Sequence, residues 1–558
     1  MNQHETRPSY GRRRPVLIPD LRNHAPFLQR PQCQRKRTVE ALLAHGFPYS
    51  KNLDAHASCV NALAFSSTDG RFLASGGDDL RIHLWDLHEE RVSTPCCTLQ
   101  GHRRNIFVLE FSAHNKFLFS GGLDETVLQY DASQLERPLL PQTDHRWPDH
   151  AFLEHTGSIR GIAPHAVQDE IFLTGSEDGR IILHDGRVHA RAQHTLQLTR
   201  EVTGVRFHPA MEHIFATSDG QGRVCLRDMR MAFGPRSQRT REGVVQLYNT
   251  KISRRPLQHL ANPETSSIVF NRQGTQLAVT MLNYLPTIYA LSDPDPVAVC
   301  SAQNLPDGTP VPEGARTYGN QCTMKAGSFG GPGLDEDVLY LAGSDDFRAY
   351  VWALPSPQAL AAQRTVISPA EWDAGEHKGI VAFAESTSAP RCVPAQLDTP
   401  RARLGGHASI VNTVVVHPRI LLAATSGVES RVVLHGAVDS LLGGMKPTSA
   451  QTREIGEAWD GDGGDEVDEV WGEDQRGTIR LFDACVASLE VAVWFIDSTC
   501  SILRREAEDD VFVVRPWTGD SDEEATEAGA ESEEVGTGTD EDEEMESAEE
   551  DSEGSIDG

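Results

Sequence analysis

The sequence predicts an all-β protein, a seven-bladed β-propeller with a basic arm before it and an acidic tail after it. Three observations predict this class. Similar units recur along residues 50–436, and each unit holds short stretches in which apolar and polar residues alternate, as in half-buried strands. Turn-forming residues separate these stretches. The units number seven, which is enough to close a ring of small sheets.

The units follow one another at a regular spacing. The clearest covers residues 56–86, with alternating stretches that begin at Val60, Phe72 and Ile82. The other six cover residues 101–131, 155–185, 202–228, 267–289, 323–352 and 406–435. The fifth and sixth units are the most degenerate.

Polar residues keep fixed distances from the end of the third stretch. In the first three units an Asp stands six residues before the closing Trp, Tyr or His, and a Ser or Thr stands ten residues before it. These sets are Asp79 and Ser75 before Trp85, Asp124 and Ser120 before Tyr130, and Asp178 and Thr174 before His184. The offsets resemble those of the WD40 family, whose fold is a propeller, and the resemblance covers roughly residues 50–436.

In the WD40 family the opening His, the turn Asp, the strand Ser or Thr and the closing Trp form a buried hydrogen-bonded network in each blade. The resemblance therefore implies a structural network made of His56, Ser75, Asp79, Trp85, His102, Ser120, Asp124, His155, Thr174, Asp178, Asp346, Trp352, His407 and Thr425. Two units depart from the pattern, with Gln221 and Glu429 at the turn position. We expect those two blades to be less regular.

The same side chains could instead be catalytic, with His102 and Asp124, or His155 and Asp178, as a base and its orienting partner. The structural interpretation is favoured because buried polar groups need such partners. The sequence also has no motif of a hydrolase, a metalloprotease or a nucleotide-binding enzyme. Ten cysteines without a C-x-x-C pair suggest neither a disulfide framework nor a zinc site. We therefore expect no enzyme activity, no cofactor and no metal site.

The two ends of the chain have opposite charge. Residues 1–49 form the basic arm, and residues 518–558 form a tail with nineteen acidic residues and no Lys or Arg. Both should be largely disordered, because few apolar residues are present to offset the ordering entropy. The Arg-rich clusters at residues 12–14 and 35–37 fit a nuclear import signal or a phosphate-binding arm, and equally a solvated tail. No base-reading element accompanies them, so direct nucleic-acid binding is not expected.

The regions between and after the blades are long. Insertions occupy residues 132–150, 293–320 and 355–403, and an acidic, Gly-rich linker occupies residues 437–477. The insertion of residues 355–403 should be mostly disordered, since it is rich in Ala, Ser and Pro. Within residues 478–517, Ile479, Phe482, Val486 and Leu489 share one helical face. This segment is either an amphipathic helix that docks on the propeller or binds a partner, or a strand that completes a blade.

The chain holds no apolar run of about 18 residues and no apolar leader after Met1. We therefore expect an intracellular protein of the nucleus, the cytoplasm or both, without a membrane partner.

Two consecutive units end in Asp-x-Arg, as Asp185-Gly186-Arg187 and Asp228-Met229-Arg230. This pair resembles the double Asp-x-Arg box of the substrate receptors that dock on the damaged-DNA-binding adaptor of cullin-RING ligases. The resemblance implies that each Asp fixes a turn and each Arg projects from the rim towards the adaptor. The alternative is a turn-closing Asp with an Arg in water. Both boxes lack the usual Trp and have His184 and Arg227 in its place.

Further stretches resemble one subgroup of these receptors, the DDB- and cullin-associated factors numbered five and six, and factor five in particular. They begin at Cys59, Asn105, Cys322, Ser344 and Ser409. The resemblance implies a non-catalytic receptor that recruits a client protein for ubiquitin transfer by a separate subunit. The alternative is a general interaction scaffold in a nuclear or chromatin-associated complex.

Overall fold

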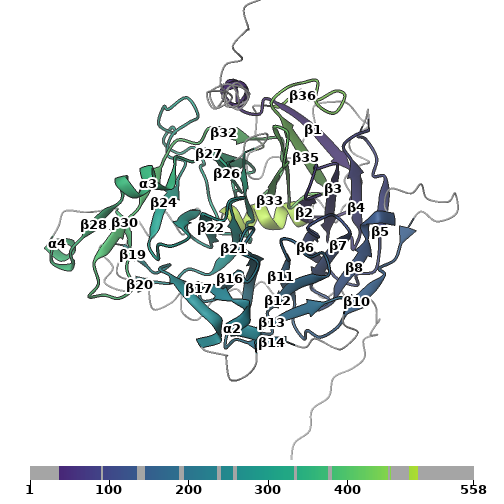
Figure 1. The fold of residues 1–558 in the computed structure, drawn as a ribbon. Helices are drawn as coiled ribbons and strands as arrows, with labels where there is room; N and C mark the ends of the chain where they lie inside the picture. The colour runs from purple at the N-terminus through teal and green to yellow at the C-terminus, as the bar shows by residue number, and fades with distance from the viewer. Residues whose placement is uncertain are drawn as a thin grey trace, which may run out of the picture. The chain divides into compact units, whose positions relative to one another are not determined.

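The chain divides into two units, residues 1–495 and residues 496–558. The computed structural model describes parts of the first unit: residues 37–89, 92–134, 145–187, 194–234, 241–254, 260–331, 336–374, 380–449, 453 and 477–487. The predicted arm up to residue 36, most of the acidic linker and the acidic tail lie outside the described residues. The described strands form small sheets arranged around a ring (Figure 1).

In each of blades 1 to 4 the strand order from the centre outwards is the sequence order, and the outermost strand of blade 1 comes from the segment that follows the third strand of blade 2. Blade 1 contains β2 (Val60–Phe65), β3 (Phe72–Gly77), β4 (Ile82–Asp86), β5 (Cys97–Leu99) and β9 (His145–Arg146). Blade 2 contains β6 (Ile106–Phe111), β7 (Phe117–Gly122), β8 (Val127–Asp131) and β10 (His150–Phe152), with η2 (Ala132–Gln134) after β8. Blade 3 contains β11 (Ile159–Pro164), β12 (Ile171–Ser176), β13 (Arg180–Asp185) and β14 (His194–Gln197). Blade 4 contains β15 (Val202–Phe207), β16 (Ile214–Asp219), β17 (Val224–Asp228) and β18 (Val244–Tyr248), with α2 (Met229–Phe233) and η3 (Arg241–Gly243) before β18.

Blades 5 to 7 take their outer strands from more distant parts of the chain. Blade 5 contains β21 (Thr265–Phe270), β22 (Gln276–Met281), β23 (Thr287–Ala290), β24 (Pro296–Cys300) and β31 (Ala395–Leu397). Blade 6 contains β25 (Gly327–Gly330), β26 (Leu339–Gly343), β27 (Ala349–Ala353) and β32 (Ala402–Leu404). Blade 7 contains β33 (Val411–Val416), β34 (Leu422–Gly427), β35 (Arg431–Gly436), β1 (Tyr49–Asp54) and β36 (Lys446–Pro447).

Two features close the ring. Each innermost strand contacts that of the next blade, in the order β2, β6, β11, β15, β21, β25 and β33, and β33 contacts β2. In blade 7, β1 pairs antiparallel with β35 along its whole length, so a strand from the start of the described chain completes the last blade. These seven sheets agree with the seven blades that the sequence predicts.

Small residues let neighbouring blades approach closely. A Cβ atom on Gly121 of blade 2 would lie 2.7 Å from Ile159 of blade 3, and one on Gly175 of blade 3 would lie 2.7 Å from Val202 of blade 4. Both distances are too short for a real contact, so these positions need glycine. Ile159 and Val202 are fully buried, which places the apolar core between the blades.

An eighth sheet, which the sequence analysis did not predict, lies outside the ring. It contains β19 (Ile252–Arg254), β20 (Leu260–Ala261), β28 (Thr365–Ile367), β29 (Val381–Phe383) and β30 (Arg391–Val393). The helices α3 (Pro357–Gln363) and α4 (Pro369–Ala374) lie with β28, β29 and β30 in the insertion of residues 355–403. The expectation that residues 355–403 are mostly disordered is therefore wrong. Leu360, Trp372 and Phe383 are each at most 3% exposed, and their burial supplies the apolar core that composition alone concealed.

Two further helices lie at the ends of the described chain, at residues 37–43 and 477–487. In the first, Val39 and Leu43 pack in the core cluster of blades 6 and 7. The second segment is a helix in the structure, whereas the sequence was compatible with either a helix or a strand there. Within the described residues, no helix is both long and apolar enough to cross a membrane.

Candidate functional site

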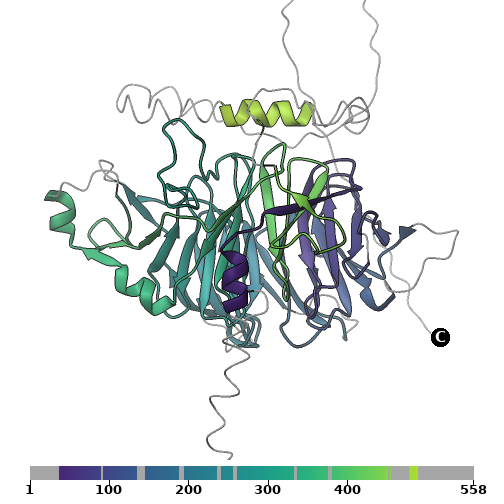
Figure 2. The same ribbon diagram turned by 90° about the horizontal axis from the view of Figure 1, so that it is seen from above.

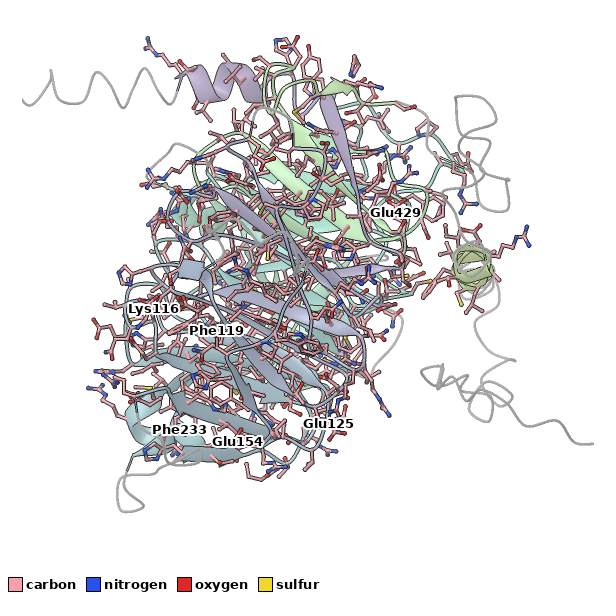
Figure 3. All side chains as sticks on the ribbon, turned by 90° about the vertical axis from the view of Figure 1, so that its right-hand side faces the viewer. Lys116, Phe119, Glu125, Glu154, Phe233 and Glu429 are labelled. Carbon is pink, nitrogen blue, oxygen red and sulfur yellow. The ribbon has the colours of Figure 1, made fainter. Side chains whose placement is uncertain are left out.

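The ring has two faces with different loops. The turns after second strands, which contain Glu125 and Glu429, lie on the side where the helix of residues 477–487 runs, and we call this the upper face (Figure 3). Lys116 and Phe233 lie towards the opposite side in the same view, which we call the lower face. Third strands end on the lower face, so both Asp-x-Arg sequences lie there.

In blade 3 the first Asp-x-Arg sequence follows β13 directly. The carboxylate of Asp185 accepts hydrogen bonds from the Arg187 backbone N at 3.1 Å, from Nε at 2.8 Å and from Nη2 at 2.7 Å. The hydrogen bond from the Arg187 side chain lowers the pKa of Asp185. The Arg187 side chain is 56% exposed, so the contact orients the guanidinium without covering it.

Blade 4 repeats this arrangement after β17. The carboxylate of Asp228 accepts from the Arg230 backbone N at 2.9 Å, from Nε at 3.1 Å and from Nη2 at 2.8 Å. Asp228 is also the N-cap of α2, and the side-chain hydrogen bond from Arg230 lowers its pKa. The Arg230 side chain is 66% exposed.

The two sequences occupy equivalent positions of adjacent blades. The N–H of Gly186 donates to the carbonyl of Glu170 at 2.8 Å, and the N–H of Met229 donates to the carbonyl of His213 at 2.7 Å. Each bond ties the residue after the Asp to the loop before the second strand of its own blade. Because β11 contacts β15, the two arginines lie on neighbouring sectors of one rim.

The same loops carry exposed apolar residues that the sequence analysis missed. Val167 is 50% exposed and Met211 is 38% exposed, and each stands in the loop that holds an Asp-x-Arg turn. The loops are built alike, because Nδ1 of His165 accepts from the Val167 N–H at 3.2 Å and Nδ1 of His208 accepts from the Met211 N–H at 2.8 Å. A His beside a Pro at the end of each inner strand is a sequence signal for the shared loop geometry, but not for the exposure of these two side chains.

Burial lowers the pKa of both His165 and His208, which keeps each ring neutral and its Nδ1 free to accept. We call Arg187, Arg230, Val167 and Met211 the lower-face surface. It combines two oriented guanidinium groups with two apolar side chains, a combination suited to binding another protein.

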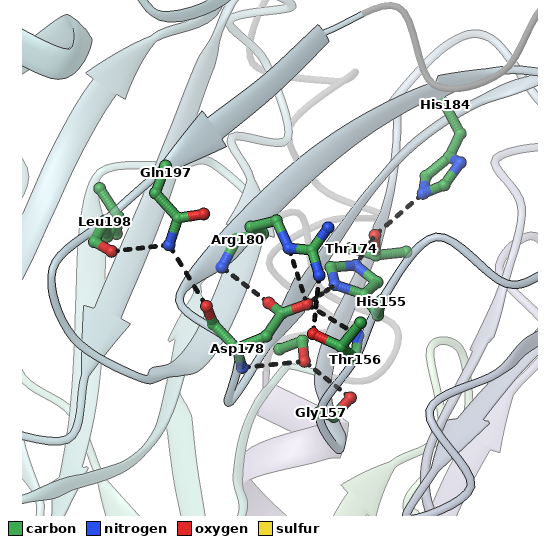
Figure 4. A network of polar contacts seen from close by, with 10 residues as sticks. His155, Thr156, Gly157, Thr174, Asp178, Arg180, His184, Gln197 and Leu198 are labelled. Carbon is green, nitrogen blue, oxygen red and sulfur yellow. Dashed lines mark hydrogen bonds and ion pairs between the residues drawn. The ribbon is translucent and has the colours of Figure 1, made fainter. Parts of the chain in front are cut away.

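The structure also brings the predicted network residues together in blades 1 to 3. In blade 3, Nδ1 of His155 lies 3.0 Å from Asp178, its Nε2 lies 2.8 Å from Thr174, and Thr174 lies 2.9 Å from Nε2 of His184 (Figure 4). Burial lowers the pKa of His184 to about 3. Arg180 lies 3.0 Å from Asp178 on its other side. The side chains of His155, Thr174, Asp178 and His184 thus form one chain of hydrogen bonds inside the blade.

Blades 1 and 2 have the same geometry. His56 contacts Asp79 at 2.9 Å and Ser75 at 2.8 Å, and Trp85 donates to Ser75 at 3.0 Å. His83 lies near enough to His56 and Asp79 for the three to be considered as metal ligands. Both ring nitrogens of His56 already have protein partners, however, and burial lowers the pKa of His83 to about 4. This arrangement fits a network in a blade better than an open metal site.

In blade 2, His102 contacts Asp124 at 2.9 Å and Ser120 at 2.7 Å. Tyr130 occupies the closing position and donates to the carbonyl of Gln100 at 3.1 Å.

Blade 7 keeps the network despite its different turn residue. Glu429 contacts Nδ1 of His407, and Nε2 of His407 lies 2.6 Å from Thr425. Nε2 of His435 lies 2.7 Å from the same Thr425. The expectation of a less regular seventh blade is therefore wrong, because the longer Glu side chain still reaches the His.

Blades 4 and 6 are arranged differently. In blade 4, Arg227 takes the closing position and donates to Thr217 at 2.9 Å. In blade 6, Asp346 accepts from Tyr350 at 2.6 Å, and Trp352 donates to the carbonyl of Ser301 at 2.5 Å. Asp346 and Trp352 are buried, but the described contacts do not join them to a His as the sequence predicted.

Residues 48–86 and 93–131 match the protein-family model described as WD domain, G-beta repeat. The chain is 32% identical over 385 residues to DDB1- and CUL4-associated factor 5 of Homo sapiens and of Mus musculus, a match that covers 68% of this chain and 33% of each relative. It is 29% identical over 132 residues to DDB1- and CUL4-associated factor 10 of Homo sapiens, covering 24% of this chain and 22% of that protein. The match thus spans about a third of the length of factor 5.

Proposed function

Since the chain is a WD40-repeat protein similar to DDB1- and CUL4-associated factor 5, we propose that it is a non-catalytic substrate receptor of a CUL4 ubiquitin ligase. In this role the lower-face surface docks on the adaptor DDB1, and another part of the ring recruits a client. A separate subunit transfers ubiquitin, and the propeller contributes proximity and orientation. Such a receptor acts inside the cell.

The repeated geometry of the two Asp-x-Arg turns is the observation that carries this proposal. Two adjacent blades orient an exposed guanidinium in the same way, through a bidentate bond to an Asp two residues earlier. An Arg that serves only as a solvated side chain needs no such fixed orientation. Held by Asp185 and Asp228, the two groups lose little side-chain freedom when they bind, which favours affinity.

The apolar members of the surface support the same conclusion. Val167 and Met211 stand in the loops next to the two turns, so a partner that contacts both arginines would also cover them. Protein interfaces commonly combine Arg and Met anchors of this kind, and a few such residues supply most of the binding free energy.

The test is co-purification of DDB1 and CUL4 with the wild-type chain and with the Arg187→Ala/Arg230→Ala variant. We expect the double substitution to weaken adaptor capture by at least about tenfold, as loss of central interface residues does. Its melting temperature should stay unchanged, because neither side chain contributes to the blade networks. Adding Met211→Asp should weaken capture further.

The matched control is the Arg81→Ala/Arg103→Ala variant, which removes two exposed arginines from the upper face. It should capture the adaptor as the wild type does. If the wild type captures no adaptor, or if both double variants behave alike, the chain is better described as a scaffold without a ligase partner.

A further inference from the structure

A second surface lies on the upper face, where the helix of residues 477–487 crosses the ring (Figure 2). The buried side of this helix carries Val486, which is 5% exposed, and the half-buried Phe482. Both pack in one cluster with four residues of blades 1, 6 and 7, namely Cys59, Phe347, Ile410 and Val428. We call these four residues and Arg453 the upper-face patch.

Arg453 gives the patch a charged, directional element. Its Nη1 donates to Asp483 at 2.8 Å and its Nη2 donates to the other carboxylate oxygen at 2.5 Å, while Nε donates to the carbonyl of Ala408 at 2.8 Å. The guanidinium also lies 5.2 Å from the ring centre of Phe347. The side chains of Arg453 and Asp483 are 6% and 7% exposed, so the helix contributes an acidic group at a fixed place.

The helix resembles a bound ligand more than a part of the ring. Its described part spans residues 477–487, and isolated helices of this length are marginal in water, so docking stabilises this stretch of helix. Its outer side exposes Leu481 by 59%. The strands of blades 1, 6 and 7 are complete without it.

We propose that the upper-face patch is a docking site for an amphipathic helix of a client protein, for which residues 477–487 compete. The recognised helix has an aromatic residue, an acidic residue directly after it and an aliphatic residue four positions after the aromatic, as in Phe482, Asp483 and Val486. Residues four apart share a helical face, which sits on the apolar cluster, and the acidic residue flanks that face and meets Arg453.

The term client rests on the proposed function, but the binding site does not. The upper-face patch and the lower-face surface lie on opposite faces of the ring, so occupation of one leaves the other open (Figure 3). A receptor needs this separation, because adaptor and client must be bound together. Competition by the chain's own helix would reduce the affinity for any partner helix in proportion to the fraction of time that the site is occupied.

The test uses the full chain and a fluorescein-labelled peptide with the sequence of residues 477–487. The Phe482→Asp/Val486→Asp variant empties the patch, because it places charge against the apolar cluster. Fluorescence polarisation should give an affinity at least about tenfold higher for this variant than for the wild type, since the chain's own helix no longer competes. Leu481→Asp is the matched control, and this variant should bind the peptide as weakly as the wild type does.

Two further arms define the recognised chemistry. Adding Arg453→Gln to the emptied variant, or replacing Asp by Asn in the peptide, should reduce peptide binding by about tenfold because the bidentate ion pair is lost. Displayed helices with the three contact positions randomised should, when selected on the emptied variant, be enriched in the aromatic–acidic–aliphatic arrangement.

The proposal is overturned if the emptied variant binds the peptide no better than the wild type does, or if selected helices lack the acidic position. It is also overturned if emptying the patch unfolds the ring, since the helix would then be a structural part of the fold. An Asp483→Asn variant, which weakens the contact without adding charge, checks this last point independently. Adaptor capture is measured separately on the same variants, so failure here is distinguishable from failure of the proposed function.

Discussion

Blades 2 and 6 both hold buried polar groups around the turn after their second strand, but these groups are hydrogen-bonded or ion-paired in different ways. In blade 2, His102 lies 2.9 Å from Asp124 and 2.7 Å from Ser120, a network of one carboxylate and two hydrogen-bonding groups. In blade 6, Nζ of Lys325 lies 2.6 Å from Asp345. Both turns thus bury a carboxylate beside a partner. In blade 2 this is Asp124 with a His, and in blade 6 it is Asp345, one residue before the position that corresponds to Asp124, with a Lys. A sequence search for the His–Asp pair alone therefore finds the network of blade 2 and misses the ion pair of blade 6.

The two solutions differ in what their loss would cost. An Asp–His–Ser network loses one hydrogen-bonding group at a time, whereas an ion pair that loses one member leaves an uncompensated charge. The side chains of Lys325 and Asp345 are 0% and 9% exposed, so water does not replace the missing partner.

The largest effect is expected in blade 6. Replacing Lys325 by Met leaves the buried Asp345 side chain without its ion-pair partner, and should lower the free energy of unfolding by about 3–5 kcal/mol. Chemical denaturation of the wild type and the variant measures this difference. The Lys325→Met/Asp345→Asn variant should recover part of the loss, because the amide oxygen can still accept from the Gln321 N–H that bonds to Asp345 at 2.6 Å. If the Lys325→Met variant is as stable as the wild type, the ion pair does not stabilise the fold.

A smaller effect is expected in blade 2. Replacing Asp124 by Ala leaves His102 without its carboxylate and also removes the acceptor of the Arg103 N–H, which lies 3.0 Å away. The free energy of unfolding should fall by about 1–3 kcal/mol, as for other buried polar groups left unpaired. The control is Glu125→Gln, since Glu125 is the exposed next residue of the same turn. Equal melting temperatures for the wild type and the Asp124→Ala variant would show that the network is not needed.

These blades also indicate how far the sequence could predict the structure. The matches to the repeat model and to factor 5 confirm the WD40 resemblance, and the regular turn offsets located the partners of Asp79, Asp124 and Asp178. Local periodicity is enough for this, because the three inner strands of each blade are close in sequence. The same offsets placed Asp346 in a network, but blade 6 uses Tyr350 and no His within the described contacts.

Features that depend on distant pairing could not be predicted in this way. The eighth sheet joins β19 to β29, whose residues Ile252 and Phe383 are far apart in the sequence, and neither strand has a repeat signature. The exposure of Val167 and Met211 also depends on neighbouring loops, and sequence does not give it. The helix face at Phe482 and Val486 could be predicted, but the patch beneath it is assembled from three blades.

Blade 3 extends the comparison, because its network contains a second titratable ring. His184 occupies the closing position that Tyr130 fills in blade 2. Its Nε2 lies 2.9 Å from Thr174, and its ring stacks on Phe172 with 4.5 Å between the ring centres. Burial lowers its pKa to about 3. In the unfolded chain a His has a pKa of about 6.5, so between these two values the unfolded state binds the additional proton.

The smallest predicted effect is therefore a dependence of stability on pH that arises in blade 3. Because the folded-state pKa of His184 is lowered, its contribution is complete above about pH 6.5 and is lost as the pH falls towards the folded value. Between pH 7 and pH 6 the wild type should lose about 0.7 kcal/mol more of its unfolding free energy than a His184→Gln variant does, whatever the absolute stability of that variant. Denaturation curves at the two pH values measure this difference in slope. A Tyr130→Phe variant in blade 2 removes no group that titrates in this range and should keep the wild-type slope. If His184→Gln keeps it too, the proton is taken up elsewhere, and burial in blade 3 does not hold this ring neutral.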